Sequence, residues 1–568
     1  NRLYYCTPMN RVIALDPVSG QERWRFDPHT GDGGEGLIDQ PRQAVRCRSV
    51  AYWEAADPRP GVPCERRVFK GDINGNVYAI DADTGRSCSD VGAGNGHPGY
   101  ASHWDYEGNG PGPRHTTSGP IVIDDLVVAA VGVEDSPVDA SDGFVRAFDV
   151  RSGELRWEFN PIPPDHVHDT GAANVWSTLS ADLDRGLVFL PTTSPSSDFY
   201  GGTRKFPIPY ATATVALSAR TGEPAWHFQV VHHDVYDYDL PGHPLLVTIQ
   251  KDGKPREVAI QQTKAGYLFV FDRDDGEPVF PIEERPVPDS DIEGEQTSPT
   301  QPFPLLPEPF TRTTLTRDDM FGLTYLGRSW CQKRFDELRY DGMFTPPSER
   351  GTLHFPGFSG GGNWGGAAFD PNTNLLVIKS MTIGTQHWLI PNEGGAITPL
   401  PDEADAEVPG SSYRDGTGDP MPGTRYATKT EVFQAPSGVP CTPPPWGTLT
   451  AIDMDSGKVM WQRPFGKSRR YGITFPESWG SVIIGGPIVT AGGIVVMAAS
   501  MDKKIRALDI ETGEELWQDK LPYAGMAVPM TYMADGKQFI VIAAGGNRRA
   551  FAEEGDAIVA YTLSQEAR

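Results

Sequence analysis

The feature that most constrains the fold is a phrase that returns along the chain: apolar residues, an Asp-type turn, then Gly and often Trp. The fuller copies are Ala14-Leu15-Asp16 with Gly20 and Trp24, Ala147-Phe148-Asp149 with Gly153 and Trp157, Ala216-Leu217-Ser218 with Gly222 and Trp226, Ala451-Ile452-Asp453 with Gly457 and Trp461, and Ala507-Leu508-Asp509 with Gly513 and Trp517. The partial copies are Ala79-Ile80-Asp81 with Gly85, Val270-Phe271-Asp272 with Gly276, and Ala368-Phe369-Asp370. We therefore count eight copies of one repeated unit.

Each copy predicts a strand that ends in a tight turn, followed by a second strand. Asp accepts local backbone hydrogen bonds, and Gly adopts the positive φ that the reversal needs. Trp on the following strand is a flat apolar plate that one unit cannot bury alone, so neighbouring units must stack on it. The sequence therefore predicts an all-β fold, an eight-bladed β-propeller with tryptophan-docking repeats.

Composition agrees with this fold class. The 63 Gly and 52 Pro among 568 residues leave few uninterrupted stretches for long helices. No linker-like run separates two halves, so we expect residues 1–568 to form a single propeller domain. Residues 391–445 are rich in Pro, Gly and acidic residues and are interpreted as a long surface insertion.

Charge and hydropathy argue against two kinds of partner. The 50 basic and 75 acidic residues give a net charge of −25 without a basic cluster, which is unfavourable for nucleic acid and for an anionic membrane. The sequence has no run of about 18 apolar residues, so it predicts no transmembrane segment. Because residues 3–6 resemble a strand rather than a signal peptide, we expect a mature, soluble chain.

The cysteines carry little information by spacing. Cys6, Cys47, Cys64, Cys88, Cys331 and Cys441 form no CxxC or CxxCH motif, which argues against zinc and against covalently attached haem. Disulfides of an oxidising compartment and free core thiols are both compatible with the spacing. Sequence alone does not choose a pairing.

Titratable side chains are concentrated in residues 232–241, His-His-Asp-Val-Tyr-Asp-Tyr-Asp-Leu-Pro. Such groups are costly to bury and have no reason to gather on an ordinary strand, so the stretch predicts a polar site or a cation site. A solvated loop is the alternative interpretation.

This stretch, together with Thr263-Lys264-Ala265-Gly266, resembles the quinoprotein dehydrogenases, specifically the membrane-bound glucose and quinate dehydrogenase branch. Similar segments continue at 3–8, 47–52, 339–349, 485–487 and 555–561, so the resemblance covers essentially the whole chain. It implies an eight-bladed propeller that holds pyrroloquinoline quinone (PQQ) and a divalent metal, usually calcium. The membrane anchor common in that branch has no counterpart in the sequence.

The resemblance implies an enzyme that oxidises an alcohol and passes electrons to an external quinone or soluble cytochrome, in the periplasm or outside the cell. Asp237 corresponds to the general base for the substrate hydroxyl. A base that removes the hydroxyl proton while hydride leaves the carbon avoids a free alkoxide. A carboxylate suits this role. Lys264 corresponds to the donor to the quinone oxygens, where a cation stabilises developing negative charge.

The metal shell implied by the resemblance consists of Glu134, Asp135, Ser194 and Asp237. Oxygen ligands suit a hard cation such as calcium, with magnesium or a lanthanide as alternatives. Asp239 stands two residues after Asp237, at a spacing used by lanthanide-dependent relatives and also by the glucose branch, so it does not decide the metal.

Further cofactor contacts are implied at Trp176, Arg48, Asn363, Trp364, His115 and Asp502. Trp176 lies outside the repeated phrase and corresponds to the tryptophan that stacks on the tricyclic cofactor; a core tryptophan is the alternative. The glycines at 360–362 suit close approach to a flat ligand or, equally, a flexible loop. His115 suits either the cofactor's carboxylates or a structural role.

Departures from the glucose branch concern the substrate pocket. Asn547 stands where glucose dehydrogenases have His, Tyr236 replaces a Trp beside Asp237, and Phe358 replaces an Asn. A more aromatic pocket mouth suits a less polar alcohol. We therefore expect the substrate to be a secondary or alicyclic alcohol. Sugar, polyol and quinate-like substrates come close behind. Glucose dehydrogenase proper and a cofactor-free propeller scaffold are the alternatives.

Overall fold

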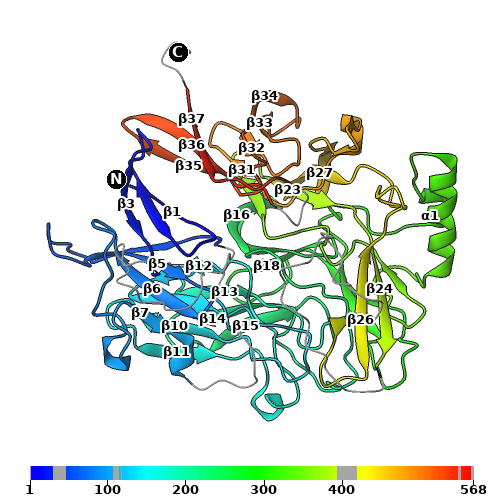
Figure 1. The fold of residues 1–568 in the computed structure, drawn as a ribbon, viewed down its shortest axis with the longest axis horizontal. Helices are drawn as coiled ribbons and strands as arrows, with labels where there is room; N and C mark the ends of the chain where they lie inside the picture. Colours follow the sequence, from blue (N-terminus) through cyan, green and yellow to red (C-terminus); the bar gives the residue numbers. More distant parts are fainter. Residues whose placement is uncertain are drawn as a thin grey trace. The chain divides into compact units, whose positions relative to one another are not determined.

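The computed structural model describes residues 2–29, 47–106, 114–116, 118–392, 419–547 and 552–563. They fall into two compact units: unit 1 comprises Asn1–Asp135, Asp139–Ser196 and Ile208–Gln229, and unit 2 comprises Ser136–Val138, Ser197–Pro207 and Val230–Arg568. Strands predominate in both, and α1 (Tyr325–Glu337) is the one α-helix among the described residues (Figure 1). The expectation of an all-β chain is confirmed.

Unit 1 contains four antiparallel sheets whose strands follow one another in chain order, β1–β3, β4–β7, β8–β11 and β12–β15. Their bounds are β1 (Leu3–Cys6), β2 (Val12–Leu15), β3 (Glu22–Phe26), β4 (Ala51–Glu54), β5 (Arg66–Gly71), β6 (Asn76–Asp81), β7 (Tyr100–Ser102), β8 (Ile121–Ile123), β9 (Leu126–Ala130), β10 (Val145–Asp149), β11 (Leu155–Phe159), β12 (Ser180–Asp182), β13 (Leu187–Pro191), β14 (Ala213–Ser218) and β15 (Pro224–Gln229).

The sheets of unit 1 pack face to face in chain order. Val12 and Phe26 of the first sheet share a buried cluster with Tyr78 of the second. Similar clusters join the second sheet to the third and the third to the fourth. Each sheet is therefore covered by its neighbour, as expected for repeats that cannot bury their own apolar faces.

Unit 2 contains three sheets of the same meandering kind, β16–β18, β31–β34 and β35–β37, and a fourth of order β22-β23-β27-β28. The remaining sheets are β19-β20, β21-β24-β26-β25 and β29-β30. The bounds are β16 (Leu245–Lys251), β17 (Lys254–Gln262), β18 (Leu268–Asp272), β19 (Ile282–Pro286), β20 (Thr300–Pro304), β21 (Thr352–His354), β22 (Ala367–Asp370), β23 (Leu375–Met381), β24 (Thr385–Pro391), β25 (Asp419–Pro420), β26 (Tyr426–Val432), β27 (Gly447–Asp453), β28 (Lys458–Pro464), β29 (Arg469–Arg470), β30 (Ile473–Thr474), β31 (Ile488–Val489), β32 (Ile494–Met497), β33 (Lys504–Asp509), β34 (Glu515–Lys520), β35 (Met530–Ala534), β36 (Lys537–Ala544) and β37 (Ala557–Thr562).

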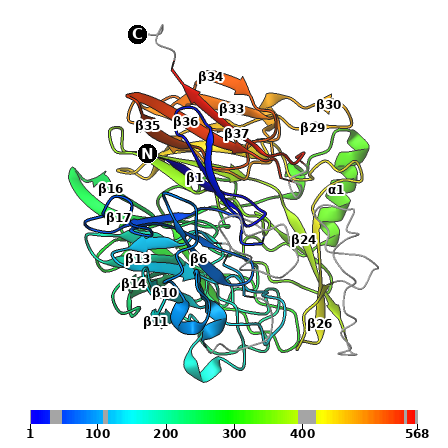
Figure 2. The same ribbon diagram turned by 60° about the vertical axis from the view of Figure 1, so that its left-hand side comes forward.

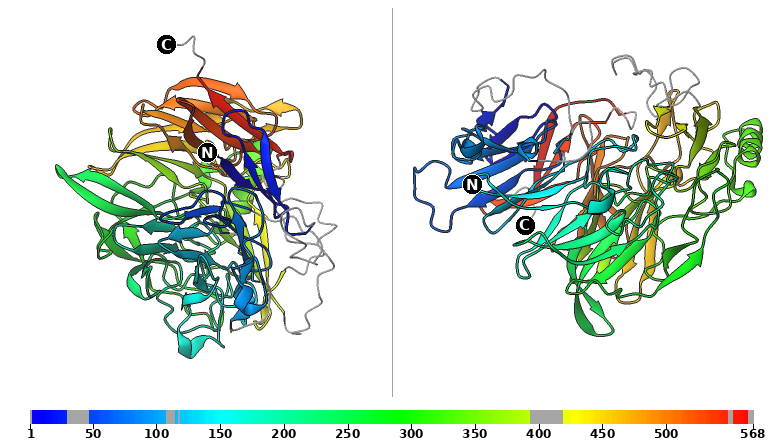
Figure 3. Two further views of the ribbon diagram at one scale, coloured as in Figure 1. Left: turned by 90° about the vertical axis from the view of Figure 1, so that its left-hand side faces the viewer. Right: turned by 90° about the horizontal axis from the view of Figure 1, so that it is seen from below.

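Face-to-face packing continues within unit 2. Buried side chains join β16–β18 to the sheet of β22, that sheet to β31–β34, and β31–β34 to β35–β37. Figure 3 shows the last two of these sheets, in orange and red, lying one against the other.

The repeated phrase forms the turn that its residues predict. At Asp509 the side-chain Oδ1 accepts backbone N–H groups of Glu511 (3.0 Å) and Thr512 (2.8 Å), and the Asp509 carbonyl accepts the N–H of Gly513 at 2.8 Å. Gly513 has φ of 65°. The expected strand, turn and second strand are confirmed at this copy.

Three tryptophans of the phrase contact the turn of the next sheet. The indole N–H donates to the carbonyl just beyond the next Asp-type residue: Trp24 to Ala82 at 3.1 Å, Trp157 to Ala219 at 2.6 Å, and Trp461 to Ile510 at 2.8 Å. The turn glycine lies against the indole ring, and an added Cβ would meet that ring at 2.6 Å from Gly85, 2.6 Å from Gly222 and 2.7 Å from Gly513. These glycines therefore supply both the positive φ and room for the ring.

One copy of the phrase does not mark a sheet of its own. Asp370 ends β22, and Asp453 ends β27 of the same sheet. The Oδ1 of Asp370 accepts the N–H of Asn372 at 3.1 Å, which closes a simple β22–β23 turn. Conversely, β35–β37 carries no copy. The phrase therefore marks turns and does not correspond one to one with the stacked sheets.

The insertion expected at 391–445 is only partly described, because residues 393–418 lie outside the described residues. In the described part, β26 pairs with β24, and Phe433 and Cys441 are fully buried, so this part is less superficial than expected. It packs with α1, which stands beside β24 and β26 in Figures 1 and 2. A disulfide between Cys331 of α1 and Cys441 joins them, with Cα atoms 5.4 Å apart.

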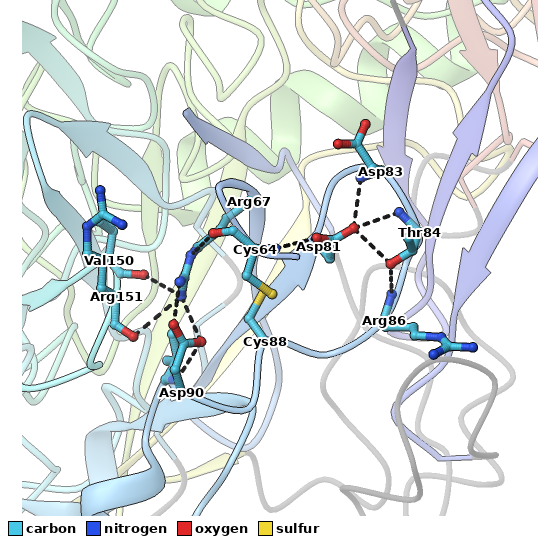
Figure 4. Close-up of a disulfide and its surroundings, with 11 residues drawn as sticks. Cys64, Arg67, Asp81, Asp83, Thr84, Arg86, Cys88, Asp90, Val150 and Arg151 are labelled. Atoms are coloured by element: carbon cyan, nitrogen blue, oxygen red, sulfur yellow. Dashed lines mark hydrogen bonds and ion pairs between the residues drawn. A yellow bond between two sulfur atoms is a disulfide. The ribbon is translucent and has the colours of Figure 1, made fainter. Parts of the chain in front are cut away.

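The other four cysteines form two disulfides in unit 1, Cys6–Cys47 and Cys64–Cys88. Figure 4 shows the second, beside the buried Arg67. The Arg67 guanidinium donates to the carbonyls of Cys64 (2.8 Å) and Val150 (3.0 Å) and pairs with Asp90. This arginine therefore ties the disulfide loop to the strands of the next sheet.

Among the described residues, no helix has the length and apolar character needed to cross a membrane.

The indole contact gives a paired stability test. Gly20 and Gly85 occupy equivalent turns with φ of 70° and 74°, but an added Cβ meets nothing within 4 Å at Gly20 and the Trp24 ring at Gly85. We expect Gly20→Ala to cost about 1 kcal/mol through backbone strain. Gly85→Ala should cost a further ~2 kcal/mol through overpacking. Urea and thermal unfolding of both variants would measure the difference; equal losses would show that the indole contact does not limit this turn.

Candidate active site

The polar stretch at 232–241 forms a buried, capped loop of unit 2 between β15 and β16. Asp234 is 1% exposed, and its carboxylate accepts the backbone N–H groups of Tyr236 (2.8 Å) and Tyr238 (3.1 Å). Asp237, between them, has φ of 53°, and His233 has φ of 45°. Residues other than Gly adopt this left-handed backbone region at a cost in free energy, and residues with such a backbone gather at functional sites. The solvated-loop interpretation is therefore wrong.

Lys264 joins this loop through three contacts. Its ammonium donates to the carbonyl of Asp237 at 2.8 Å, to the Oδ1 of Asp237 at 2.7 Å and to the Oδ2 of Asp239 at 3.1 Å. The side chains of Lys264 and Asp239 are each 6% exposed, and that of Asp237 is 17% exposed. The more open carboxylate of the pair is thus Asp237.

The charge of Lys264 is strongly stabilised. Burial disfavours the ammonium, but attraction by Asp237 and then Asp239, together with their hydrogen bonds, raises the pKa of Lys264 above its ordinary value. A lysine held between two carboxylates stays cationic through the physiological range. It can therefore supply fixed positive charge at the loop.

The glycines at 360–362 pack against the backbone of Lys264. The N–H of Gly361 donates to the Lys264 carbonyl at 2.7 Å, and that of Gly362 donates to the Thr263 carbonyl at 3.2 Å. An added Cβ at Gly360 would lie 2.8 Å from both Cα and Cβ of Lys264. This segment is therefore neither a free loop nor an open cradle; it supports the lysine from behind.

Aromatic side chains form a layer against the loop. The Tyr236 ring lies 5.4 Å from Phe344 and 6.1 Å from His354, and the rings of His354 and His387 are 4.2 Å apart. Tyr236 is 1% exposed, so it belongs to this buried layer rather than to an open pocket mouth. Phe358 is half-buried, 5.9 Å from His387.

The other predicted residues of unit 2 lie in local networks. Asn363 accepts the N–H of Trp364 at 2.8 Å and donates to the Ser359 carbonyl at 2.8 Å. The carboxylate of Asp502 pairs with buried Arg506 and accepts the Ser500 hydroxyl at 2.6 Å. Asn547 and Ala552 form an isolated β-bridge. These contacts account for Asn363 and Asp502 structurally.

Trp176 and Arg48 come together in unit 1. The Arg48 guanidinium carbon lies over the Trp176 ring, 5.1 Å from its centroid, and Trp176 is half-buried. Ala172 and Ala173 just before it have φ of 57° and 51°. Among the described residues, the Oδ1 of Asn174, the Oγ of Ser177 and the Oγ1 of Thr193 are buried without a hydrogen-bond partner.

The predicted metal ligands of unit 1 differ in burial. Glu134 is exposed, Asp135 is half-buried, and Ser194 is buried with its carbonyl accepting the N–H of Ala173 at 3.0 Å. His115 pairs with Gly132 through backbone hydrogen bonds. In the part of the chain that the structure describes, the one group of three close His, Cys, Asp or Glu ligands is Cys64, Cys88 and Asp90, whose sulfurs form a disulfide.

Sequence reasoning missed several residues that hold the loop. His233 bonds Glu295 at 3.0 Å, and buried Arg204 donates to the Asp234 carbonyl. Asp234 itself was a visible signal within the polar stretch. Arg204 and Glu295 stand far from it in sequence and carry no motif, so no sequence pattern pointed to them.

Comparison with known proteins finds a family model described as "PQQ: Glucose/ethanol/alcohol dehydrogenase, beta-propeller domain", which matches residues 1–540. Quinoprotein glucose dehydrogenase of Escherichia coli (strain K12) is 37% identical, covering 100% of this chain and 72% of that protein. Quinate/shikimate dehydrogenase (quinone) of Acinetobacter baylyi is 35% identical with the same two coverages. The large subunit of glycerol dehydrogenase of Gluconobacter oxydans is 34% identical, covering 99% of this chain and 77% of that protein.

Among solved structures, quinohemoprotein alcohol dehydrogenase from Comamonas testosteroni matches with a TM-score of 0.65 at 20% identity, covering 100% of this chain and 73% of that one. At this identity the likeness concerns the fold. Together with the family model, it establishes an all-β fold of the propeller type.

The histidine pair predicts acid sensitivity. Burial lowers the pKa of His354 to about 3. An unfolded histidine takes up its proton near pH 6.5, so His354 makes the unfolded state relatively more stable as pH falls from about 6.5 toward 3, by about 1.4 kcal/mol per pH unit. We expect His354→Phe to flatten the loss of thermal stability between about pH 6.5 and 4. Tyr236→Phe, in the same layer, is the control and should keep the wild-type slope; parallel curves for both variants would contradict the assignment.

Proposed function

Because the chain belongs to the family of PQQ-dependent glucose, ethanol and alcohol dehydrogenases, we propose that it oxidises an alcohol to a carbonyl compound and passes the electrons to an external acceptor. The observation that carries this proposal is the Lys264 ammonium shared by Asp237 and Asp239 at the strained loop. It unites a fixed cation and a partly open carboxylate, which base-assisted oxidation of an alcohol requires.

We propose a single eight-bladed propeller for the whole chain. Four stacked sheets of three or four strands in each unit support this number among the described residues. The indole contacts of Trp24, Trp157 and Trp461 support tryptophan docking between blades. The three disulfides support the periplasm or the cell exterior as its location.

The residues of unit 1 suit a planar cofactor with carboxylate groups. Trp176 offers a flat ring beside the Arg48 cation. The Nε of Arg114, the Oδ1 of Asn174 and the Oγ of Ser177 are buried without a hydrogen-bond partner among the described residues. Polar atoms of this kind are costly to leave unpaired and would be satisfied by a bound polar ligand. We therefore assign Trp176, Arg48 and His115 to PQQ, and we carry over Asn363, Trp364 and Asp502 from the family resemblance.

Asp237 is assigned the role of general base. Its side chain is the more exposed carboxylate of the pair that shares Lys264, so an alcohol hydroxyl can approach it. The Lys264 ammonium lies 2.7 Å from the Oδ1 of Asp237 and places a positive charge beside this carboxylate. PQQ, when bound, supplies the quinone carbonyl that accepts the hydride, and Lys264 is the cation that would hold its oxygens.

A divalent cation is assigned to Glu134, Asp135, Ser194 and Asp237. Carboxylate and hydroxyl oxygens are the donors that calcium prefers. Magnesium and a lanthanide use the same donor type, so calcium is the first metal to supply. The acceptor we propose is a quinone or a soluble cytochrome, since the sequence has no CxxCH motif for a haem of its own.

The proposed base is tested by dye reduction with calcium and a panel of alcohols, with and without added PQQ. We expect turnover that requires PQQ and falls by about 10³-fold in Asp237→Asn, because the amide cannot accept the proton. Asp509→Asn, in a turn of the same unit, is the matched control and should keep wild-type turnover. Activity of Asp237→Asn close to wild type would show that Asp237 is not the base. If the wild-type protein neither binds PQQ nor turns over any alcohol, the cofactor-free propeller scaffold would be the better description.

The substrate class is tested by comparing kcat/KM for cyclic secondary alcohols, quinate, polyols and glucose. We expect cyclic secondary alcohols to exceed glucose, because half-buried Phe358 and the Asn at 547 offer less polar recognition than the glucose branch. Asn547→His should raise relative turnover of glucose. Glucose dehydrogenase is the second candidate, favoured by the 37% identity to the enzyme of Escherichia coli, and glucose as the best substrate would establish it.

A further inference from the structure

The backbone at Asp237 needs support from its surroundings. With φ of 53°, this residue lies in the left-handed region that favours glycine. A residue other than glycine keeps this conformation when neighbouring groups determine it. The direction in which the Asp237 carboxylate points follows from that backbone conformation.

Asp234 accepts the backbone N–H groups of the two residues that flank Asp237. Its Oδ1 accepts the N–H of Tyr236 at 2.8 Å, and its Oδ2 accepts the N–H of Tyr238 at 3.1 Å. The carboxylate is 1% exposed, so water does not compete for these bonds. One side chain therefore sets the turn in which Asp237 lies.

Arg204 holds Asp234 from the other side. It is 1% exposed, and its Nη2 donates to the carbonyls of Asp234 and, at 3.3 Å, Ser197. The Lys264 ammonium donates to the carbonyl of Asp237 itself at 2.8 Å. The carbonyls on both sides of the turn thus bond to buried cations.

A second anchor lies immediately before Asp234. His233 bonds the Oε1 of Glu295 at 3.0 Å, and the Oε2 of Glu295 accepts the N–H of Gly201 at 2.5 Å. A Cβ on Gly201 would lie 2.2 Å from the His233 Nε2, so a larger residue there would displace the His233 ring. The start of the turn is therefore fixed independently of Asp234.

These contacts differ from those of an ordinary turn. Asp509 also caps two N–H groups, but its turn is exposed and places a glycine at positive φ. At the loop, the capping carboxylate is buried, the backbone carbonyl of the same residue accepts from an arginine, and an aspartate occupies the positive φ. Stability alone would be served by a glycine at 237, so the arrangement retains a carboxylate in a costly conformation.

We propose that Asp234 is a positioning residue that aims the Asp237 carboxylate, with Arg204 holding Asp234 in place. The inference rests on the proposed function, in which Asp237 receives the substrate proton. It assigns the third residue of the His-His-Asp stretch to orientation of the base rather than to contact with substrate or cofactor.

The test uses the PQQ-loaded protein with calcium and its best alcohol. Asp234→Ala should lower kcat about 100-fold and leave KM and PQQ affinity nearly unchanged, because a misaimed base slows the chemical step and not binding. Asp234→Asn keeps one acceptor oxygen and should lose less. Arg204→Met should shift kcat in the same direction, and a substrate deuterated at the carbinol carbon should show a larger isotope effect on kcat in the slow variants. Asp509→Ala, which removes an equivalent cap elsewhere in unit 2, should lower the melting temperature and leave kcat at the wild-type value.

The outcomes separate the two proposals. Wild-type kcat in Asp234→Ala and Arg204→Met, with a lower melting temperature, would reduce Asp234 to a structural cap and overturn the inference alone. Should Asp234→Ala fail to fold, a graded kcat loss with unchanged KM in Asp234→Asn supports the inference, and an unchanged kcat overturns it. No PQQ-dependent turnover in the wild type would overturn the proposed function and this inference with it.

Discussion

The contact that joins three of the described sheets to the next stacked sheet along the chain is the one between a tryptophan indole and a turn glycine. Trp24 lies where a Cβ on Gly85 would stand 2.6 Å from its ring, and its N–H donates to the Ala82 carbonyl. The indole buries a large apolar face and leaves no polar atom unpaired. A single sheet would expose that face, so the sheets of Trp24, Trp157 and Trp461 are covered by their neighbours at a contact that a local phrase supplies.

Within this framework, the buried ammonium of Lys264 imposes a second requirement. An isolated buried charge is strongly unfavourable, so the chain must bring carboxylates to it. Asp237 and Asp239 meet this need from one loop, and the glycines at 360–362 allow a second backbone to pack directly behind the lysine. The position of the cation is therefore set by backbone packing as much as by its ion pairs. That is why it can serve as a fixed charge rather than a mobile side chain.

The same distinction explains what could be predicted from sequence. Strand, turn and tryptophan followed from residues within about ten positions of one another, so the all-β class and the stacking were readable. The copy at Asp370 was counted as a separate repeat, but Asp-Pro-Asn favours a tight turn at any place in a sheet. The polar stretch at 232–241 was identified as a site from composition, whereas Arg204 and Glu295 reach it from distant positions without a pattern. The disulfide pairs likewise depend on tertiary proximity, which spacing does not encode.

Tyr236 illustrates how a correct sequence observation can lead to a different physical role. Beside Asp237, an aromatic residue suggested a less polar pocket mouth. The structure places its ring in the buried layer with Phe344 and His354 instead. Because this side chain is 1% exposed, we expect it to act by shaping the loop that carries Asp237 rather than by touching a substrate. In the proposed enzyme, direct discrimination between alcohols would fall to more open groups such as Phe358, and the buried layer would determine how accurately the proposed base Asp237 is aimed.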